Sequence, residues 1–157
     1  MGYTHYYYRP EVLDEKKFNL VIEDFRKVLP KISLSGVKLA GGDGRGVMTV
    51  SNEAIWLNGV AEGAHETFYL PLHYEKPSWH DQLRVDGKEE KLAFQFCKTA
   101  QKPYDIAVTC GLVIFKHHFG DAVRVHSDGD LSDWAAAVLL CESVLRYGKD
   151  FKLDKED

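Results

Sequence analysis

The chain has 157 residues, of which 45% are hydrophobic and 12% aromatic; 20 basic and 24 acidic side chains give a formal net charge of −4. This length and apolar fraction suit a single globular domain that needs neither a metal nor a disulfide to fold. The mildly acidic balance argues against binding to duplex nucleic acid, because such proteins present a strongly basic surface. No apolar run approaches the ~18 residues that span a bilayer, and the opening lacks a signal-peptide pattern, so we expect a cytoplasmic protein.

The cysteines at positions 97, 110 and 141 all lie in apolar stretches without C-x-x-C spacing. We therefore expect buried free thiols in a reducing compartment, with no disulfide framework and no bound cofactor or metal. Residues 1–148 are predicted to form one domain, and the charged residues 149–157 a loose tail.

The first predicted elements in chain order are a strand and an amphipathic helix. Residues 2–8 are rich in tyrosine, which favours a strand. Apolar side chains then recur at helical spacing from Phe18 to Leu29, with Asp14 as the N-cap and Pro30 ending the helix. Short strands are predicted next, at residues 32–34, 47–51, 54–58, 67–72 and 92–97.

Two segments between these strands are predicted to be loops. The glycine-rich run 41–46 resembles a nucleotide fingerprint, but strand-forming residues follow it, which favours a hairpin loop. The polar stretch 74–91 predicts a surface loop, and its Trp79 and His80 leave open a lid over a ligand.

The last third is predicted to contain a helix at 103–118, a strand at 122–126 and a helix at 132–147. The order β-α-β-β-β-β-β-α-β-α predicts an α+β (mixed α/β) fold. Its central sheet has helices packed on one face, and its C-terminal part is a βαβ-like unit.

The parallel strands of a βαβ unit bring the loops at 98–105 and 127–130 to the same sheet edge, and a parallel first strand would add the junction at 9–10. Lys98, Thr99 and Lys102 directly precede a predicted helix, whose free amides and partial positive charge suit a phosphate group. The alternative is that Thr99 caps the helix and both lysines are solvated.

The second loop and the tyrosines could complete such a site. Asp128 and His126 are candidates to bond a sugar or a base, whereas Asp130 or Ser132 could simply cap the last helix. Tyr6 and Tyr104 have flat faces on which a nucleobase can stack. The alternative for the tyrosines is alternate burial in the core.

None of the seven histidines has H-x-H, H-x-x-x-H or H-E-x-x-H spacing. A zinc site assembled in space from His5, His118 and His126 with an aspartate is an alternative. In an enzyme the same three histidines would be the candidates for general acid or base, because the histidine pKa lies near neutrality. Cys97, directly before a predicted helix, is a weaker candidate nucleophile.

Several motifs resemble those of a group of small phage and prokaryotic proteins that open with Gly-Tyr-Thr-His-Tyr-Trp. The matching residues are Gly2 to Tyr6, Phe96 to Ala100, Lys102 to Asp105, His118 to Asp121 and Ser127 to Gly129. Tyr7 stands where the group has Trp. The resemblance implies a phage-associated protein but no activity, and only analogy links it to proteins that sequester nucleotide immune signals.

The leading functional prediction is the binding, without catalysis, of a small phosphate-containing ligand, such as a nucleotide or nucleotide-derived signal. The predicted ligand-binding residues are Tyr6, Lys98, Thr99, Lys102, Tyr104, His126 and Asp128, with Trp79 as a further candidate. One alternative is a phosphodiesterase or hydrolase with a histidine acid or base at the same site. Another is an interaction module that inhibits a host factor through residues 74–79, and a homo-oligomer is compatible with each.

Overall fold

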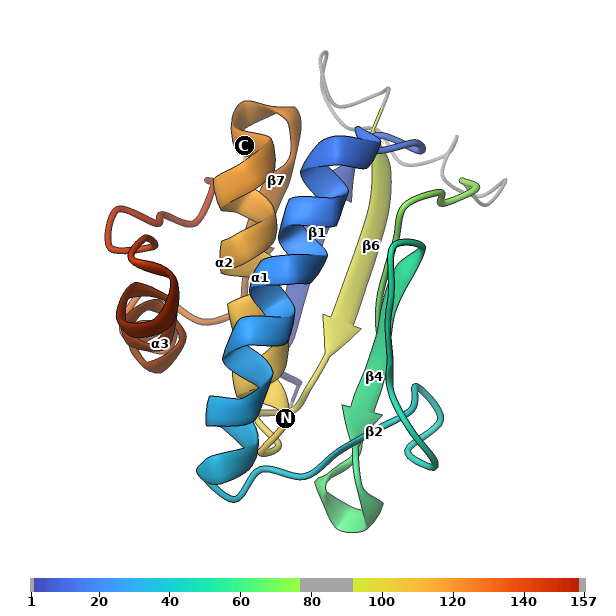
Figure 1. The fold of residues 1–157 in the computed structure, drawn as a ribbon, viewed down its shortest axis with the longest axis vertical. Helices are drawn as coiled ribbons and strands as arrows, with labels where there is room; N and C mark the ends of the chain where they lie inside the picture. Colours follow the sequence, from blue (N-terminus) through green and yellow to red (C-terminus); the bar gives the residue numbers. More distant parts are fainter. Residues whose placement is uncertain (1, 77–91, 156–157) are drawn as a thin grey trace.

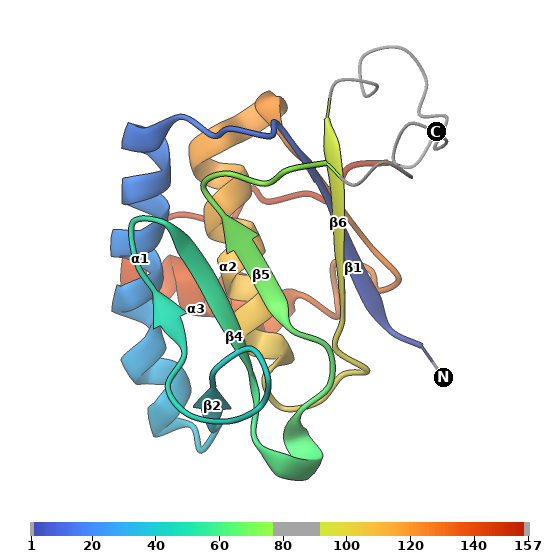
Figure 2. The same ribbon diagram turned by 90° about the vertical axis from the view of Figure 1, so that its right-hand side faces the viewer.

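Two antiparallel sheets lie on one side of a layer of helices (Figure 1; Figure 2). The computed structural model describes residues 2–76 and 92–155. In this part of the chain, the first sheet has the order β6-β1-β7, and in the second sheet β4 pairs with three neighbours. The strands are β1 (Thr4–Arg9), β2 (Leu39–Ala40), β3 (Thr49–Val50), β4 (Ala54–Gly59), β5 (Phe68–Pro71), β6 (Ala93–Lys98) and β7 (Arg124–Ser127). The predicted α+β class is confirmed.

Strand β1 is antiparallel to both of its neighbours, with Tyr6 opposite Phe96 on β6 and His126 on β7. Strands β6 and β7 therefore run parallel to each other, as expected for the βαβ-like unit, but β1 lies between them. Because β1 is antiparallel to both, the condition of a parallel first strand is not met, and the junction at 9–10 lies at the opposite edge of the sheet. The beginning of β1 instead lies between the loops that follow β6 and β7.

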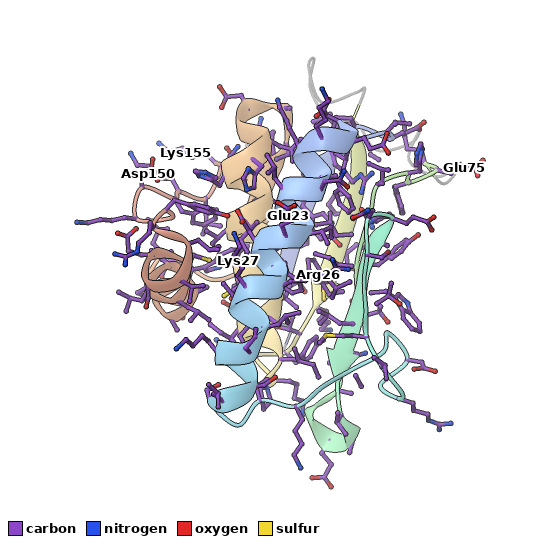
Figure 3. All side chains as sticks on the ribbon, in the orientation of Figure 1. Glu23, Arg26, Lys27, Glu75, Asp150 and Lys155 are labelled. Carbon is purple, nitrogen blue, oxygen red and sulfur yellow. The ribbon has the colours of Figure 1, made fainter. Side chains whose placement is uncertain are left out.

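Helix α1 (Glu15–Leu34) is amphipathic, as its sequence spacing predicts. The side chain of Asp14 caps it by accepting a hydrogen bond from the Lys17 amide at 2.9 Å. Its apolar stripe faces the core, whereas Glu23, Arg26 and Lys27 project from the other side (Figure 3). The buried residues are Phe18, Val21, Ile22, Phe25, Val28, Leu29 and Ile32.

The prediction that Pro30 ends this helix is wrong, because α1 continues to Leu34 with Pro30 inside it. Proline removes one backbone hydrogen bond, but Pro30 lies on the exposed face, and two residues further on Ile32 is 1% exposed. Burial of that side chain favours continuation of the helix. The strand predicted at 32–34 is therefore absent from the structure, since these residues belong to α1.

The other predicted strands are confirmed with changed ends, and β2 was not predicted. Strands β2 and β3 both pair with β4 and not with each other. The glycine-rich run 41–46 between them therefore passes across β4, and its prediction as a hairpin loop is wrong.

Helix α2 (Asp105–Phe119) matches the helix predicted at 103–118 and is buried along most of its length. It packs against α1, α3 (Ala135–Leu145) and the sheets. Gly111 allows close approach to the second sheet, because a Cβ atom there would lie 2.9 Å from a ring carbon of Phe68. None of the helices in the described ranges is long and apolar enough to cross a membrane.

The C-terminal segment as far as residue 155 is held against the domain, so the prediction of a loose tail is wrong for these residues. Phe151 is buried and its ring stacks on Trp134 at a centroid distance of 5.1 Å. The carboxylate of Asp154 accepts a hydrogen bond from the Val125 amide at 2.7 Å. Apolar and polar contacts together hold the segment beside β7.

The three cysteines are buried and free, as predicted. Burial raises the pKa of the Cys97 thiol well above its usual range, and the nearby Glu66 carboxylate adds to this effect. The thiol therefore stays protonated, which contradicts the alternative of an activated Cys97 nucleophile.

Candidate functional site

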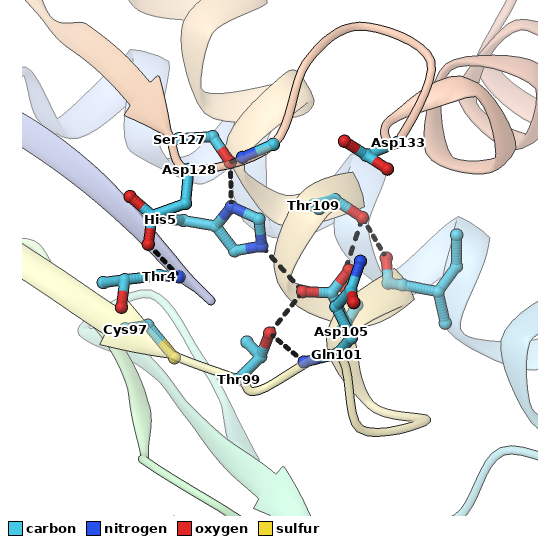
Figure 4. Close-up of polar contacts among 12 residues, drawn as sticks. Thr4, His5, Cys97, Thr99, Gln101, Asp105, Thr109, Ser127, Asp128 and Asp133 are labelled. Carbon is cyan, nitrogen blue, oxygen red and sulfur yellow. Dashed lines mark hydrogen bonds and ion pairs between the residues drawn. The ribbon is translucent and has the colours of Figure 1, made fainter. Parts of the chain in front are cut away.

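The centre of the candidate site is His5, a fully buried side chain on β1. Its Nε2 atom lies 2.6 Å from Oδ1 of Asp105, and its Nδ1 atom lies 2.8 Å from Oγ of Ser127 (Figure 4). Asp105 is the first residue of α2 and Ser127 the last of β7. Because β1 lies between β6 and β7, the loops after those two strands bring the aspartate and the serine to opposite sides of one imidazole.

The loop from β6 to α2 positions Asp105 through a tight, strained turn. The amides of Thr99 and Ala100 both donate to the carbonyl of Tyr3. Ala100 and Gln101 then adopt φ values of 53° and 57°. Such left-handed conformations cost non-glycine residues about 1–3 kcal/mol each and are concentrated at functional sites. The Thr99 hydroxyl also donates to the Asp105 carboxylate, which therefore receives two hydrogen bonds.

The surrounding donors determine the direction of this hydrogen-bond chain. The carboxylate of Asp105 can only accept, so His5 Nε2 carries a proton and donates to it. In neutral His5 the Nδ1 atom is then an acceptor, and Ser127 donates its hydroxyl proton to it. The Gly129 amide donates in turn to the serine oxygen at 3.0 Å. Serine, histidine and aspartate are thus connected as in serine hydrolases, with the roles of the two ring nitrogens exchanged.

Aromatic rings enclose the imidazole on two sides. The rings of Tyr3 and Trp134 each meet His5 edge to face at a centroid distance of 5.0 Å. Burial raises the pKa of Tyr3 to about 12, and the negative charges of Asp105 and Asp133 add to the shift. The phenol therefore remains protonated at neutral pH and can donate a hydrogen bond.

Gly129 leaves the space that the Tyr3 phenol occupies. A Cβ atom at Gly129 would lie 2.3 Å from the Tyr3 oxygen, so only glycine leaves room for that ring. The hydroxyl is thereby kept at the turn that follows Ser127.

An open hollow of about 650 Å³ lies beside the end of β7. Ser127 and Gly129 contribute to its wall, together with Leu131 and the C-terminal residues Leu153 and Lys155. A small molecule in this hollow would therefore be in reach of the serine, whereas His5 lies behind it in the core.

Two of the residues predicted to bind a ligand at the N-terminus of α2 have hydroxyl groups that bond within the fold. Thr99 and Tyr104 are fully buried, and their hydroxyls donate to Asp105 and to the carbonyl of Glu66. The first residue of α2 is itself an aspartate, which places a negative charge at the end of the helix that favours anions. Lys98 lies at the end of β6 with its Nζ atom close to Gly2, while Lys102 is half-buried in the strained loop.

Three other predicted ligand-binding residues, Tyr6, His126 and Asp128, do lie together. The Asp128 carboxylate accepts hydrogen bonds from the Thr4 amide at 3.0 Å and from the Tyr6 hydroxyl at 3.1 Å. His126 lies opposite Tyr6 on the neighbouring strand. Asp130 accepts hydrogen bonds from the amides of Ser132 and Asp133 in the turn before α3. The alternative that Asp130 or Ser132 caps the last helix is wrong, because the N-cap of α3 is Trp134 and no side chain caps it.

The three histidines proposed for a zinc site do not converge. His118 pairs with Asp24 of α1 at 2.8 Å, whereas His5 bonds to Asp105 and Ser127. Within residues 2–76 and 92–155, no group of three or more His, Cys, Asp or Glu side chains is arranged to hold a metal ion. The zinc alternative is therefore wrong for this part of the chain. Trp79 and His80 lie outside the described residues.

Sequence reasoning named His5 but missed Asp105 and Ser127 as its partners. Both were within the two loops expected at one sheet edge. The sequence does not show that β1 lies between β6 and β7, because these strands are far apart in the chain.

Comparison of the chain with protein-family models, with curated proteins and with solved structures gave no match.

Proposed function

We propose that the protein is a hydrolase in which Ser127 is the nucleophile, His5 the general base and Asp105 the residue that orients His5. The observation that carries this proposal is the hydrogen-bond chain of 2.8 and 2.6 Å, which starts at Ser127, a residue that lines an open hollow. This proposal favours the enzymatic alternative over the noncatalytic binding expected from the sequence.

The chemistry follows from the direction of the chain. As Ser127 Oγ attacks an acyl carbon or a phosphorus atom of the substrate, its proton passes to His5 Nδ1. The Asp105 carboxylate stabilises the imidazolium that forms, and the low dielectric of the buried site strengthens this attraction. His5 then protonates the leaving group. A water molecule, deprotonated by His5, subsequently releases the product from Ser127 and restores the serine proton.

Two neighbouring groups favour this reaction. The protonated Tyr3 phenol, which interacts with Ser127, can donate a hydrogen bond to the oxyanion that develops during attack. Trp134 and Tyr3 hold the imidazole plane on both sides, so that little reorganisation accompanies proton transfer.

A fluorophosphonate probe tests the proposal, because it forms a stable adduct only with an activated serine. We expect mass spectrometry of peptides to locate the adduct on Ser127. Ser127→Ala should abolish labelling, and Asp105→Asn should slow it by about 10²- to 10⁴-fold. The matched control is Ser132→Ala, because Ser132 lines the same hollow but its hydroxyl bonds to Asp130. Circular dichroism checks that each variant is folded. Native protein without an adduct at Ser127 contradicts the proposal.

A second candidate function is the binding of a nucleotide without turnover. The observation that favours it is the hydrogen bond between Tyr6 and Asp128, next to His126 on the same side of the sheet. Lys98, at the end of the neighbouring strand, adds a cation at the same edge. An aromatic ring can stack on a base, a carboxylate or an imidazole can bond to a sugar hydroxyl or a base, and an ammonium group can pair with a phosphate.

Calorimetric titration with a panel of nucleotides separates the two functions. Binding with intact nucleotide recovered, weakened by Asp128→Asn but not by Ser127→Ala, supports the binding protein. Conversion of the nucleotide that Ser127→Ala abolishes supports the hydrolase. No binding of any nucleotide contradicts the second candidate and leaves the probe experiment to decide the first.

A further inference from the structure

The hollow beside Ser127 has apolar as well as polar lining residues. Leu131, in the turn before α3, and Leu153, in the C-terminal segment, both line it. Leu153 is half-buried because it packs against the hydrophobic core, whereas Leu131 is 47% exposed. An aliphatic part of a bound molecule that contacts these leucines loses contact with water, which favours binding.

The charges around the same hollow do not suit an anion. Asp130 and Asp154 line it together with the basic residue Lys155. Two neighbouring cations are engaged within the fold, since Lys116 pairs with Asp154 at 3.0 Å and Arg124 donates to the Lys155 carbonyl at 2.5 Å. A phosphate or carboxylate group placed here would meet carboxylates without a set of cations directed at it. Two further acidic residues are exposed between β7 and α3, Asp128 and Asp133.

We propose that the substrate of Ser127 is an uncharged carboxylic ester whose acyl group is a short aliphatic chain. This inference rests on the proposed hydrolase function and narrows its reaction to acyl transfer. The chain would contact Leu131 and Leu153, and the ester brings no negative charge into the acidic surroundings. Attack at phosphorus would need cations around the transferring oxygens. The oxyanion formed from an ester carbonyl needs hydrogen-bond donors, and the Tyr3 phenol is one.

The reaction needs no reactant other than the ester and water. Ser127 Oγ forms a bond to the carbonyl carbon, the bond from that carbon to the alcohol oxygen breaks, and the alcohol leaves with the proton held by His5. A water molecule that loses a proton to His5 then attacks the acyl group, and the bond to Ser127 breaks. The products are one carboxylic acid and one alcohol, and the serine proton is restored.

Hydrolysis of p-nitrophenyl esters by the full chain tests the proposal, because the leaving group is the same in each ester. We expect kcat/KM for the butyrate to exceed that for the acetate by about fivefold, since the added methylene groups contact the leucines. The phosphate should be hydrolysed at least about 10²-fold less efficiently than the butyrate. Rates measured with Ser127→Ala are subtracted throughout.

A charged acyl group gives a matched test of the electrostatic argument. The p-nitrophenyl half ester of succinic acid has as many acyl carbon atoms as the butyrate, but it ends in a carboxylate. We expect its kcat/KM to be at least about tenfold lower. Added salt should narrow this difference, because it screens the repulsion from the acidic residues.

Leu131→Ser tests the apolar contact and should bring the ratio of butyrate to acetate hydrolysis close to one. The matched control is Leu139→Ser, because Leu139 is a 67% exposed leucine on α3 that does not belong to the lining of the hollow. That variant should keep the ratio of the unaltered protein, and circular dichroism checks that both are folded. An equal fall of the ratio in both variants overturns the proposal.

The outcomes separate this proposal from the hydrolase proposal on which it rests. A fluorophosphonate adduct at Ser127 together with preferred hydrolysis of the phosphate or of the succinate half ester overturns the substrate class and leaves the hydrolase in place. An adduct without hydrolysis of any of these esters does the same. Absence of both the adduct and hydrolysis removes the hydrolase proposal, and the substrate class with it.

Discussion

At the scale of single residues, Arg9 is a fully buried cation held by neutral oxygens. Its guanidinium donates to the carbonyls of Pro10, Glu11, Pro71 and Leu72 and to the side-chain oxygen of Gln95. Burial lowers its pKa to about 10, so it remains charged at neutral pH. The guanidinium joins β1 to the end of β5, and it thereby connects the two sheets.

Arg9→Lys should lower the free energy of unfolding by about 2–4 kcal/mol, because an ammonium group cannot reproduce the planar fork that reaches these acceptors. Urea denaturation measures the change. The control is Arg26→Lys, since Arg26 is an exposed arginine that donates to the carbonyl of Val50. We expect a change within about 0.5 kcal/mol there. Equal changes in the free energy of unfolding for the two substitutions would show that the planar guanidinium of Arg9 is not required for stability.

At the scale of elements, α1 shows how burial outweighs a local breaker. Pro30 cannot donate the hydrogen bond that an amide at its position would make. Pro30→Ala should therefore raise the free energy of unfolding by about 1–3 kcal/mol. Urea denaturation again measures it, with Lys31→Ala on the same exposed turn as the control, for which we expect little change. A less stable Pro30→Ala protein would mean that the proline relieves strain in α1.

Long elements could be predicted from the sequence, whereas their ends could not. The apolar stripe identified α1, because burial of one face imposes a period on many residues at once. Helix α2 is apolar on nearly all sides, and it was identified by its length and by Pro103 and Gly120 near its ends. The end of α1 depends on Ile32 reaching the core, and β2 depends on pairing with β4. Such tertiary contacts leave no local pattern.

The candidate site was predictable as two loops but not as a set of interacting side chains. The loops after β6 and β7 meet because these strands are parallel, a rule that sequence order alone supplies. His5 reaches both Asp105 and Ser127 only because β1 lies between β6 and β7. The loop also needs left-handed backbone conformations at Ala100 and Gln101, which these residue types do not favour. Long-range pairing and strain therefore account for what the sequence did not reveal.

At the scale of the whole molecule, one polar cluster ties the helices together. Asp24 of α1 accepts hydrogen bonds from Tyr147 at 2.6 Å and from His118 of α2 at 2.8 Å, and His117 stacks on Tyr147 at 3.6 Å. Burial alone would raise the pKa of Asp24, but the hydrogen bonds from Tyr147 and His118 outweigh it and lower this pKa. Burial and the neighbouring His118 lower the pKa of His117.

Both shifts make the fold sensitive to acid. A carboxyl group with a lowered pKa in the folded state stabilises it above its ordinary pKa, and this contribution is lost as the pH falls through the lowered value. Asp24→Asn should therefore be less stable than the unaltered protein at pH 7, by about 1 kcal/mol, but should lose less stability between about pH 5 and pH 2. Thermal unfolding across this range measures the difference. Glu23→Gln, an exposed neighbour on α1, should keep the original acid dependence, and parallel curves for the unaltered protein and Asp24→Asn contradict the assignment.

The central position of β1 has a consequence for biosynthesis. It leaves the ribosome before either of its partners, and the second partner, β7, begins more than one hundred residues later. At ordinary translation rates this delay is roughly 5–25 s. During that time a strand with three adjacent tyrosines lacks at least one of its two native neighbours, and closing such long loops makes folding slow. The nascent chain therefore exposes an extended aromatic segment until synthesis is nearly complete.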